Sequence, residues 1–341
     1  MKLLITGANG FLGKYVVAEA LRRGHTVRAM IRSAADAERN GWADHPKIEL
    51  AHADLRRRKG LADACRGVDA VLHLAAAKAG DMYAQYGGTV VATENLLAAM
   101  EEANVRRIVS ISSFSVYDYM KVPYFSTVNE FSPVEADAFD RDEYAHTKLV
   151  QERLVRMWCT ERNWVFTVLR PGVIFGRGNL WSARLGAKGK RVWLRIGAWA
   201  RVPLTYVENC AEAIVAAADA DGAKNQILNV VDDETPTQRR YVALLRKREP
   251  RRPLVVPVPY SLAWLTANAA KLFNRWACGG KAKVPGVLVP SRLAARAKPL
   301  RYTNAGIKRA IPWRPRFTLA ESLDRSLSSH DAALTAIRGA A

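Results

Sequence analysis

Near its start the chain reads Lys2-Leu3-Leu4-Ile5-Thr6-Gly7-Ala8-Asn9-Gly10-Phe11-Leu12-Gly13. The apolar run before Thr6 is typical of a buried strand, and the apolar spacing over residues 11–23 predicts a helix. Glycine is needed where a chain turns tightly and where its backbone must come close to a pyrophosphate. The free N–H groups at the start of the helix then attract phosphate. The segment therefore predicts a dinucleotide-binding turn at the beginning of a parallel α/β domain.

Short β-rich runs alternate with helical stretches along the chain, a pattern that is typical of a parallel sheet covered by helices. We therefore predict an α/β fold with a Rossmann-type doubly wound parallel sheet and a smaller C-terminal substrate-binding subdomain. The predicted strands cover residues 2–6, 26–31, 48–53, 70–74, 108–112, 165–169 and 226–230. The predicted helices cover residues 11–23, 93–103 and 210–220.

The predicted domain boundaries follow from a change in composition after Pro171. Residues 1–176 form the dinucleotide-binding domain, completed by 205–230, and residues 331–341 form a C-terminal tail. Residues 177–204 and 231–330 form the substrate-binding subdomain, whose first segment is rich in Gly, Arg and Trp. Within 231–330 one apolar stripe recurs at helical spacing, at Leu262, Leu265, Ala269, Leu272, Phe273 and Trp276. We favour packing of this stripe on its own domain, and contact with a membrane interface is the alternative.

The positive charge is concentrated in the second half of the chain. The net charge is +20, of which residues 1–176 contribute +2 and residues 177–341 contribute +18. This asymmetry favours an anionic partner, such as a nucleotide diphosphate, a coenzyme A tail or an anionic lipid surface, and a solvated basic face is the plain alternative. Motifs typical of nucleic-acid-binding proteins do not occur in the sequence, so we expect no nucleic-acid partner.

The cysteines and the apolar runs indicate the compartment. The four cysteines are far apart, without a CxxC pair or a neighbouring histidine at metal-ligand spacing, so we expect reduced thiols and no metal site. No run of 18 uninterrupted apolar residues occurs, and the first strand leads directly into the glycine-rich turn. We therefore expect a cytoplasmic protein without a signal peptide or a transmembrane helix, and with at most peripheral membrane contact.

The residues after the second predicted strand indicate which coenzyme is used. An Asp or Glu about 20 residues after the glycine-rich turn would accept a hydrogen bond from a ribose 2′-hydroxyl. Ile31 holds that place here, Arg32 follows it, and Arg28 stands four residues earlier. A guanidinium binds a 2′-phosphate that a carboxylate would repel. The sequence therefore favours NADP over NAD.

Several further motifs resemble those of the extended short-chain dehydrogenases, the NAD-dependent epimerase/dehydratase group. They are Asp54-Leu55, His73-Leu74-Ala75-Ala76, Ser112-Ser113, Tyr144-Ala145-His146-Thr147-Lys148, Leu169-Arg170-Pro171-Gly172-Val173-Ile174-Phe175-Gly176 and Ile311-Pro312-Trp313-Arg314-Pro315. The resemblance is to the branch of dihydroflavonol reductases and 3β-hydroxysteroid dehydrogenases, and it implies that His73 is a core residue. The cofactor-binding residues that we predict are Thr6, Gly7, Asn9, Gly10, Phe11, Leu12, Gly13, Arg32, Asp54, Leu55, Leu74, Ala75, Ala76, Tyr144, Lys148, Pro171, Gly172 and Val173.

Tyr144, Lys148 and Ser113 are the predicted catalytic residues. Tyr144 and Lys148 are spaced i, i+4 and project from one face of a helix, so the ammonium can lower the pKa of the phenol. Tyr144 then exchanges a proton with the substrate oxygen as hydride moves, and Ser113 hydrogen-bonds the same oxygen. We prefer Ser113 to Ser112 and Ser115 because it precedes Tyr117 by four residues, the Ser-x-x-x-Tyr spacing of the family. The resemblance also implies that Lys148 holds the nicotinamide ribose.

Three functions fit these residues. The first is a dehydrogenase or reductase, which Arg32 and the Leu-Arg-Pro-Gly run favour. The second is a nucleotide-sugar epimerase with retained NAD, in which Arg177, Arg184, Lys190, Arg191 and Arg195 would clamp a diphosphate. The third is a non-catalytic NADP-sensing regulator, which the intact Ser113, Tyr144 and Lys148 disfavour. Thr89 replaces an asparagine that is frequent in the family, so the role of that amide is in doubt. The substrate is either anionic or a hydrophobic alcohol, and the resemblance implies a homodimer paired through the helix carrying Tyr144 and the one before it.

Overall fold

A seven-stranded sheet lies at the centre of the computed structural model, which describes residues 1–138, 141–249, 252–279, 282, 284–331, 334, 335 and 337. Its strand order is β12-β7-β5-β4-β1-β2-β3, and all neighbouring strands are parallel. The order runs outward in both directions from β1, as in a doubly wound sheet, which confirms the predicted Rossmann-type fold. The strands are β1 (Lys2–Thr6), β2 (Thr26–Ile31), β3 (Ile48–His52), β4 (Ala70–His73), β5 (Arg107–Ile111), β7 (Val165–Pro171) and β12 (Gln226–Val230).

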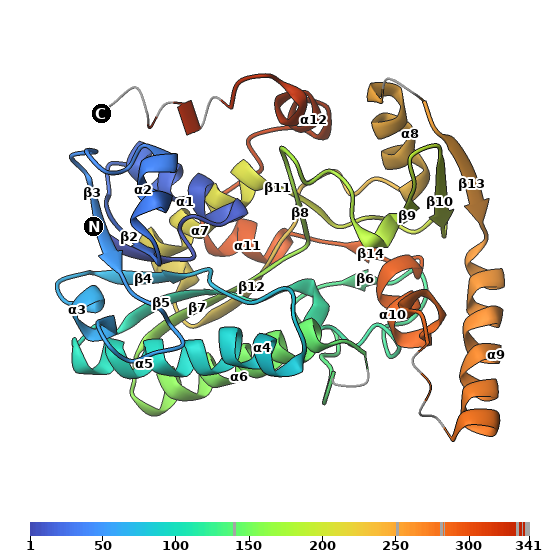
Figure 1. Cartoon of the computed structure of the whole chain (residues 1–341), viewed down its shortest axis with the longest axis horizontal. Helices are drawn as coiled ribbons and strands as arrows, with labels where there is room; N and C mark the ends of the chain where they lie inside the picture. Colours follow the sequence, from blue (N-terminus) through green and yellow to red (C-terminus); the bar gives the residue numbers. More distant parts are fainter. Residues whose placement is uncertain are drawn as a thin grey trace.

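Helices cover both faces of this sheet (Figure 1). One face is covered by α1 (Phe11–Arg22), α2 (Ala34–Asn40) and α7 (Val207–Asp219). The other face is covered by α3 (Leu61–Cys65), α5 (Ala92–Glu102) and α6 (Glu143–Glu161), with the short α4 (Met82–Tyr86) beside them. The predicted strands and helices agree with the observed ones to within a few residues at their ends.

Side chains of each central strand alternate between two apolar cores. Leu3 and Ile5 of β1 pack with α1 and α7, whereas Leu4 packs with α3, α5 and α6. Alternation places successive side chains on opposite faces of a strand, and helices bury both faces. This explains why the strand sequences are almost continuously apolar.

Smaller elements, most of them from the second half of the chain, lie at one end of the sheet (Figure 1). They include a three-stranded sheet in the order β13-β10-β9 and the two-stranded pairs β11-β8 and β14-β6. Their bounds are β6 (Thr127–Val128), β8 (Val173–Phe175), β9 (Gly186–Lys188), β10 (Val192–Ile196), β11 (Leu204–Tyr206), β13 (Leu254–Val258) and β14 (Arg301–Tyr302). The helices at this end are α8 (Gln238–Arg248), α9 (Tyr260–Cys278) and α10 (Pro290–Ala297), whereas α11 (Ala305–Ala310) and α12 (Leu319–Leu327) lie nearer to α7. Ile307 and Leu323 join the same apolar core as α1 and α7.

The apolar stripe predicted for residues 262–276 lies on α9, but the favoured packing of the stripe on its own domain is wrong. Leu265, Phe273 and Trp276 are exposed. The helix contacts the rest of the chain through its opposite face, where Ala263 and Ala267 pack on α10. Within the described ranges, no helix combines the length and apolarity needed to cross a bilayer. Most of the predicted tail, residues 331–341, lies outside the described residues.

Candidate active site

The glycine-rich turn joins the end of β1 to the start of α1. Gly7 has a φ of +68°, and a Cβ on Gly13 would lie 2.1 Å from the carbonyl oxygen of Gly7. A side chain at either position would therefore distort the turn. The first turn of α1 contains no acidic residue. Its N-cap residue is Gly10, and no described side chain forms a capping hydrogen bond there. The N–H groups and the positive end of the helix dipole are thus available to a phosphate.

A cavity of about 490 Å³ lies where β1, β2, β3 and β4 end, and we name it the strand-end cavity. Seven predicted cofactor-binding residues line it: Gly7, Asn9, Arg32, Asp54, Leu55, Ala75 and Ala76. Six others lie in the adjoining turn, helix and strand end without lining it: Thr6, Gly10, Phe11, Leu12, Gly13 and Leu74. Arg56 and Lys78 also line the cavity, and the sequence did not single them out. The cavity, the turn and the helix N-terminus together fit a dinucleotide.

The charged residues of the strand-end cavity surround Asp54. Arg56 donates to the Asp54 carboxylate, with 2.6 Å between Nη2 and Oδ2. This hydrogen bond, with further help from the charge of Arg32, lowers the pKa of Asp54 to about 2. Arg28, whose position before Arg32 also indicated a part in coenzyme binding, does not line the cavity. Its Nε lies 2.6 Å from Glu49 Oε2, and its Nη1 donates to carbonyl groups at the end of α3.

A second cavity, of about 240 Å³, brings together four of the predicted residues, and we name it the arginine pocket. Ser113 follows β5, Tyr144 lies in the first turn of α6, and Gly172 and Val173 come from the junction of β7 and β8. Pro171, the last residue of β7, is buried beside them. The other lining residues are Phe114, Ser115, Arg141, Asp142, Ser182, Ala183, Arg184, Arg292, Ala295 and Arg296.

The two neighbouring serines have different partners. Ser112 is buried and donates to Glu152 Oε2 at 2.6 Å. Ser113 accepts a hydrogen bond from the backbone N–H of Ser115 at 3.1 Å, and its side chain also hydrogen-bonds Tyr144. Ser113 is therefore the serine whose hydroxyl lies beside the phenol in the pocket.

The pKa values of Tyr144 and Lys148 differ from the sequence expectation. Burial raises the pKa of Tyr144, and the hydrogen bond with Ser113 opposes this without reversing it. Lys148 Nζ instead donates to Ile111 O at 2.6 Å and to Gln151 Oε1 at 2.8 Å. The prediction that Lys148 lowers the pKa of Tyr144 is therefore wrong in this structure, because desolvation of the phenol dominates. Burial also lowers the pKa of Lys148 to about 7, and the charge of Lys78 adds to this shift.

His73 lies in a buried chain of hydrogen bonds that links Lys148 to the glycine-rich turn. Gln151 Nε2 donates to Thr93 Oγ1 at 2.8 Å. His73 Nε2 lies 2.8 Å from the same hydroxyl, and His73 Nδ1 lies 2.8 Å from Thr6 Oγ1. Burial lowers the pKa of His73 to about 3, so the ring is neutral. The expectation that His73 is a hydrogen-bonded core residue is confirmed.

Thr89, which stands where the family often has asparagine, supports the wall of the strand-end cavity. Its hydroxyl accepts a hydrogen bond from the backbone N–H of Ala77 at 3.0 Å. A Cβ on the adjacent Gly88 would lie 2.8 Å from the Cβ of Ala77. The hydroxyl of Thr89 therefore holds the segment after β4 in place.

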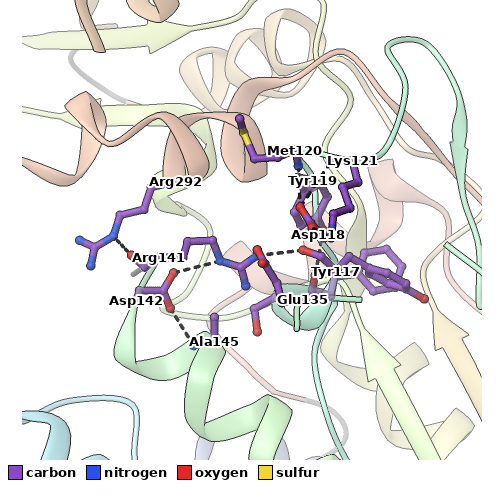
Figure 2. A network of polar contacts seen from close by, with 12 residues as sticks. Tyr117, Asp118, Tyr119, Met120, Lys121, Glu135, Arg141, Asp142, Ala145 and Arg292 are labelled. Carbon is purple, nitrogen blue, oxygen red and sulfur yellow. Dashed lines mark hydrogen bonds and ion pairs between the residues drawn. The ribbon is translucent and has the colours of Figure 1, made fainter. Parts of the chain in front are cut away.

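Four arginines line the arginine pocket, at positions 141, 184, 292 and 296. Arg141 is 3 % exposed, and its Nη1 donates to Glu135 Oε1 at 2.9 Å (Figure 2). Arg292 donates through Nε to the carbonyl oxygen of Arg141 (Figure 2). Among the described residues, Arg141 Nη2 and Arg184 Nη1 are buried without a hydrogen-bond partner. Two guanidinium groups of the pocket therefore keep donors for a further acceptor.

The charges of the pocket are not balanced. Asp142 is the single carboxylate among its lining residues, and its Oδ1 already caps α6 by accepting from the N–H of Ala145 at 2.7 Å. Burial lowers the pKa of Arg296, the positive charges of Arg292 and Arg184 lower it further, and Asp142 opposes them. An anionic group in the pocket would relieve this repulsion.

The diphosphate clamp predicted from the sequence is mostly wrong. Of its five residues only Arg184 lines the arginine pocket. Arg177 Nε lies 3.5 Å from Asp331 Oδ2, and Lys190 and Arg191 are exposed in the turn between β9 and β10. Charge density along a loop does not determine which side chains face a cavity, because the β9–β10 hairpin directs alternate residues to opposite sides.

No cluster of three or more potential metal ligands occurs within the part of the chain that the structure describes. Cys65, Cys159 and Cys210 are buried thiols without a disulfide. Burial raises the pKa of Cys65 and of Cys159 to about 12. These thiols therefore stay protonated and have a packing role.

A parallel sheet with a glycine-rich turn, a strand-end cavity and a Ser/Tyr pocket defines a dinucleotide-binding α/β protein. Residues 3–230 match the model of the NAD dependent epimerase/dehydratase family. The chain belongs to this family, as the resemblance of its motifs predicted.

Two relatives and one solved structure illustrate what the chain is similar to. A 3β-hydroxysteroid dehydrogenase/Δ5→4-isomerase of Mycobacterium tuberculosis is 33% identical over 187 residues, which are 52% of this chain and 48% of that protein. The chain thus matches about half the length of this relative. The N-acetyl-α-D-glucosaminyl-diphospho-ditrans,octacis-undecaprenol 4-epimerase of Escherichia coli O157:H7 is 26% identical over 338 residues, 95% of this chain and 94% of that protein. A UDP-glucose 4-epimerase of Stenotrophomonas maltophila, solved with NAD and formylated UDP-arabinopyranose, shares the fold with a TM-score of 0.72 at 19% identity over both whole chains.

Proposed function

We propose that the chain is an NAD(P)-dependent oxidoreductase that moves a hydride between the coenzyme and a substrate carbon bearing oxygen. The observation that carries this proposal is that Ser113 and Tyr144 share one pocket, with Lys148 one helical turn after Tyr144. The nicotinamide ring supplies the hydride acceptor or donor when the coenzyme is bound. Gly7 and Asn9 of the strand-end cavity would hold its phosphates, with Leu55 and Asp54 near the adenosine.

Tyr144 acts as a proton donor in this proposal. Because burial raises its pKa, the phenol is protonated at neutral pH and can give its proton to a substrate oxygen as the carbon is reduced. The hydroxyl of Ser113 stabilises the developing charge on that oxygen. In its protonated form Lys148 retains one N–H donor beyond its bonds to Ile111 and Gln151, and this donor is available to the nicotinamide ribose.

NADP is the coenzyme that the charges of the strand-end cavity favour. Arg32 and Arg56 both line it, and the only carboxylate among its lining residues, Asp54, is already paired with Arg56. Two guanidinium groups near one neutralised carboxylate suit a 2′-phosphate better than a 2′-hydroxyl.

The arginine pocket favours a substrate with an anionic group. Its guanidinium groups at 184, 292 and 296 come from residues 177–204 and 231–330, which supports the assignment of these segments to the substrate side. A phosphate or carboxylate there would accept from the unpartnered nitrogens of Arg141 and Arg184. The anion would bind beside Tyr144 and would orient the reacting carbon.

Replacement of Tyr144 tests the reaction. Tyr144→Phe removes the transferable proton and should lower turnover by about 10²–10⁴-fold, while NADPH binding measured by fluorescence titration stays unchanged. Screening nucleotide sugars and carbonyl compounds with both coenzymes identifies the substrate for this comparison. Retained turnover in Tyr144→Phe would refute the proton role.

Arg32→Ala should weaken NADPH binding and leave NADH binding unchanged, and equal affinities for both coenzymes in the wild type would refute the NADP preference.

A nucleotide-sugar epimerase is the second candidate. Its support is the alignment over nearly the whole chain with a relative that acts on a diphospho-linked sugar, together with the arginine pocket. An epimerase oxidises and re-reduces one carbon, so it should purify with tightly bound coenzyme and show no net change in nicotinamide absorbance during turnover. A reductase consumes one equivalent of NADPH for each product molecule.

We infer that the protein functions as a homodimer in the cytoplasm. The buried unpaired thiols Cys65, Cys159 and Cys210 suit a reducing compartment. The outer faces of α5 and α6 would pair in the dimer, and Met157 on α6 is 57 % exposed there. Met157→Glu should convert the dimer to a monomer in sedimentation velocity, and an unchanged mass would refute this pairing.

A further inference from the structure

Helix α9 carries apolar side chains on opposite faces. Ala263 and Ala267 form one face and pack on Leu293 and Ala297 of α10. The other face consists of Leu262, Leu265, Ala269, Leu272, Phe273 and Trp276, which we name the apolar stripe. The five large side chains of the stripe are exposed by 53 % (Leu262), 67 % (Leu265), 70 % (Leu272), 62 % (Phe273) and 84 % (Trp276). At 3.6 residues per turn they cover an arc of about 100° that points away from α10.

This arrangement is the reverse of an ordinary surface helix, whose large apolar side chains face the core. Here Ala263 and Ala267 lie against α10 with Tyr260 and Trp264 packed beside them, and the five large side chains of the stripe are left outside. A contiguous row of five large apolar groups is unusual on a protein that has no partner for it. The stripe therefore requires an apolar environment beyond the described residues.

The charges around the stripe identify that environment. The segment 250–290, which contains α9, has six Lys and Arg and no Asp or Glu. Lys271 and Arg275 lie on α9 itself and are exposed. A helix with Leu, Phe and Trp on one face, basic residues outside that face and no acidic residue is typical of segments that lie in the interface of an anionic bilayer.

The neighbouring small sheet carries further exposed apolar side chains. Leu254 and Val256 of β13, the strand that directly precedes α9, are exposed. They pair in register with Val192 and Leu194 of β10, which are exposed as well. Figure 1 shows β13 and α9 following one another along one edge of the molecule. This edge would lie on the surface of a membrane. No described helix is long and apolar enough to cross one.

We infer that α9 docks the protein on the surface of an anionic phospholipid bilayer. The apolar stripe enters the region between headgroups and acyl chains, and Arg275, about 60° around the helix from the edge of the stripe, reaches toward the phosphates. Helix α10 lies between this surface and the arginine pocket: Leu293 and Ala297 contact α9, whereas Arg292 and Arg296 line the pocket. Helices α9 and α10 thus separate the docked membrane from the pocket. The docking depends on the stripe and its charges alone, so it stands independently of the proposed reaction.

Vesicle sedimentation of the purified full chain tests the docking. Wild-type protein should sediment with vesicles of phosphatidylglycerol and phosphatidylcholine, and should stay in the supernatant with phosphatidylcholine alone. Leu265→Glu with Trp276→Glu should lower the partition coefficient by on the order of tenfold or more for each side chain. Lys271→Gln with Arg275→Gln should lower it by about fivefold per charge, and added salt should have the same direction of effect.

Phe131→Glu is the matched control, because Phe131 is 92 % exposed and lies outside this surface. It should bind vesicles like the wild type, and all variants should keep the wild-type melting temperature since the replaced side chains are exposed. Trp276→Phe should retain binding and lose most of the fluorescence quenching by acyl chains brominated near the headgroup. Three results would overturn the inference: wild-type protein that stays in the supernatant with anionic vesicles, equal binding by Leu265→Glu/Trp276→Glu, or a wild-type dimer that this double variant converts to a monomer.

Discussion

The buried ion pair between Glu152 and Arg170 offers the sharpest test of how the catalytic helix is held. Both side chains are 3 % exposed, and 3.0 Å separates Arg170 Nε from Glu152 Oε2. Ser112 donates to the same carboxylate oxygen, and the Arg170 guanidinium lies 4.9 Å from the ring centre of Tyr117. The pair connects α6, one turn after Lys148, to β7 in the centre of the sheet. Removing either partner leaves the other charge buried and unpaired.

The magnitude follows from the geometry. At 3.0 Å and an effective dielectric constant of about 20, the two charges attract by about 5.5 kcal/mol. Desolvation of the two ions, several kcal/mol each, largely offsets this attraction. We therefore expect Glu152→Met or Arg170→Met to cost about 3–5 kcal/mol each, whereas the double variant should be near neutral. For 341 residues, at about 2.1 cal/mol/K per residue, each single change lowers the melting temperature by about 4–7 °C.

Calorimetry and urea unfolding of the wild type, the two single variants and the double variant measure this cycle. Ser112→Ala is the control, because it removes one donor from the carboxylate and should cost only about 1 kcal/mol. The reasoning fails if the single variants melt within about 1 °C of the wild type. It also fails if the double variant loses as much stability as the two single variants together.

Three further predictions concern single buried groups. Burial raises the pKa of Asp232 from 3.8 to about 7, so this carboxyl favours the folded state below about pH 4 and loses that contribution as pH rises through 7. The stability of the wild type relative to Asp232→Asn should therefore fall by up to roughly 4 kcal/mol between pH 4 and 8 in urea titrations, and a constant difference would contradict the assignment. Gln151→Glu places a carboxylate at the 2.8 Å contact with Lys148 Nζ and should raise the pKa of that lysine, which moves the pH–rate midpoint upward by about one unit or more; an unchanged profile would exclude a positioning role. Arg296→Ala should raise KM for the anionic substrate about tenfold or more and leave coenzyme binding unchanged, and an unchanged KM would place the anion elsewhere.

Local features of the sequence predicted most of the fold. The apolar runs that became β1, β4 and β5 are buried on both faces, and their character follows from burial in any parallel sheet. The glycines at 7 and 13 are required by backbone geometry within a single turn. The i, i+4 spacing of Tyr144 and Lys148 likewise places both on one helix, whatever surrounds it.

The arginine pocket illustrates what such patterns miss. The sequence predicted that a basic loop at 177–195 binds the anion, yet three of the four pocket arginines lie outside this loop, namely Arg141, Arg292 and Arg296. These residues lie up to 155 positions apart, since 296 − 141 = 155. They meet because α10 packs near the start of α6, where Arg292 donates to the backbone of Arg141. No spacing rule connects residues so distant in the chain.

By itself the sequence determined the class of fold, the glycine-rich turn and the identity of the Ser, Tyr and Lys candidates, since each depends on a few consecutive residues. Tertiary structure alone decided that Tyr144 has a raised pKa, that the apolar stripe of α9 faces outward and which arginines share a pocket. Desolvation and side-chain direction depend on what packs against a residue from elsewhere in the chain, and that neighbour is specified only once the whole fold has formed.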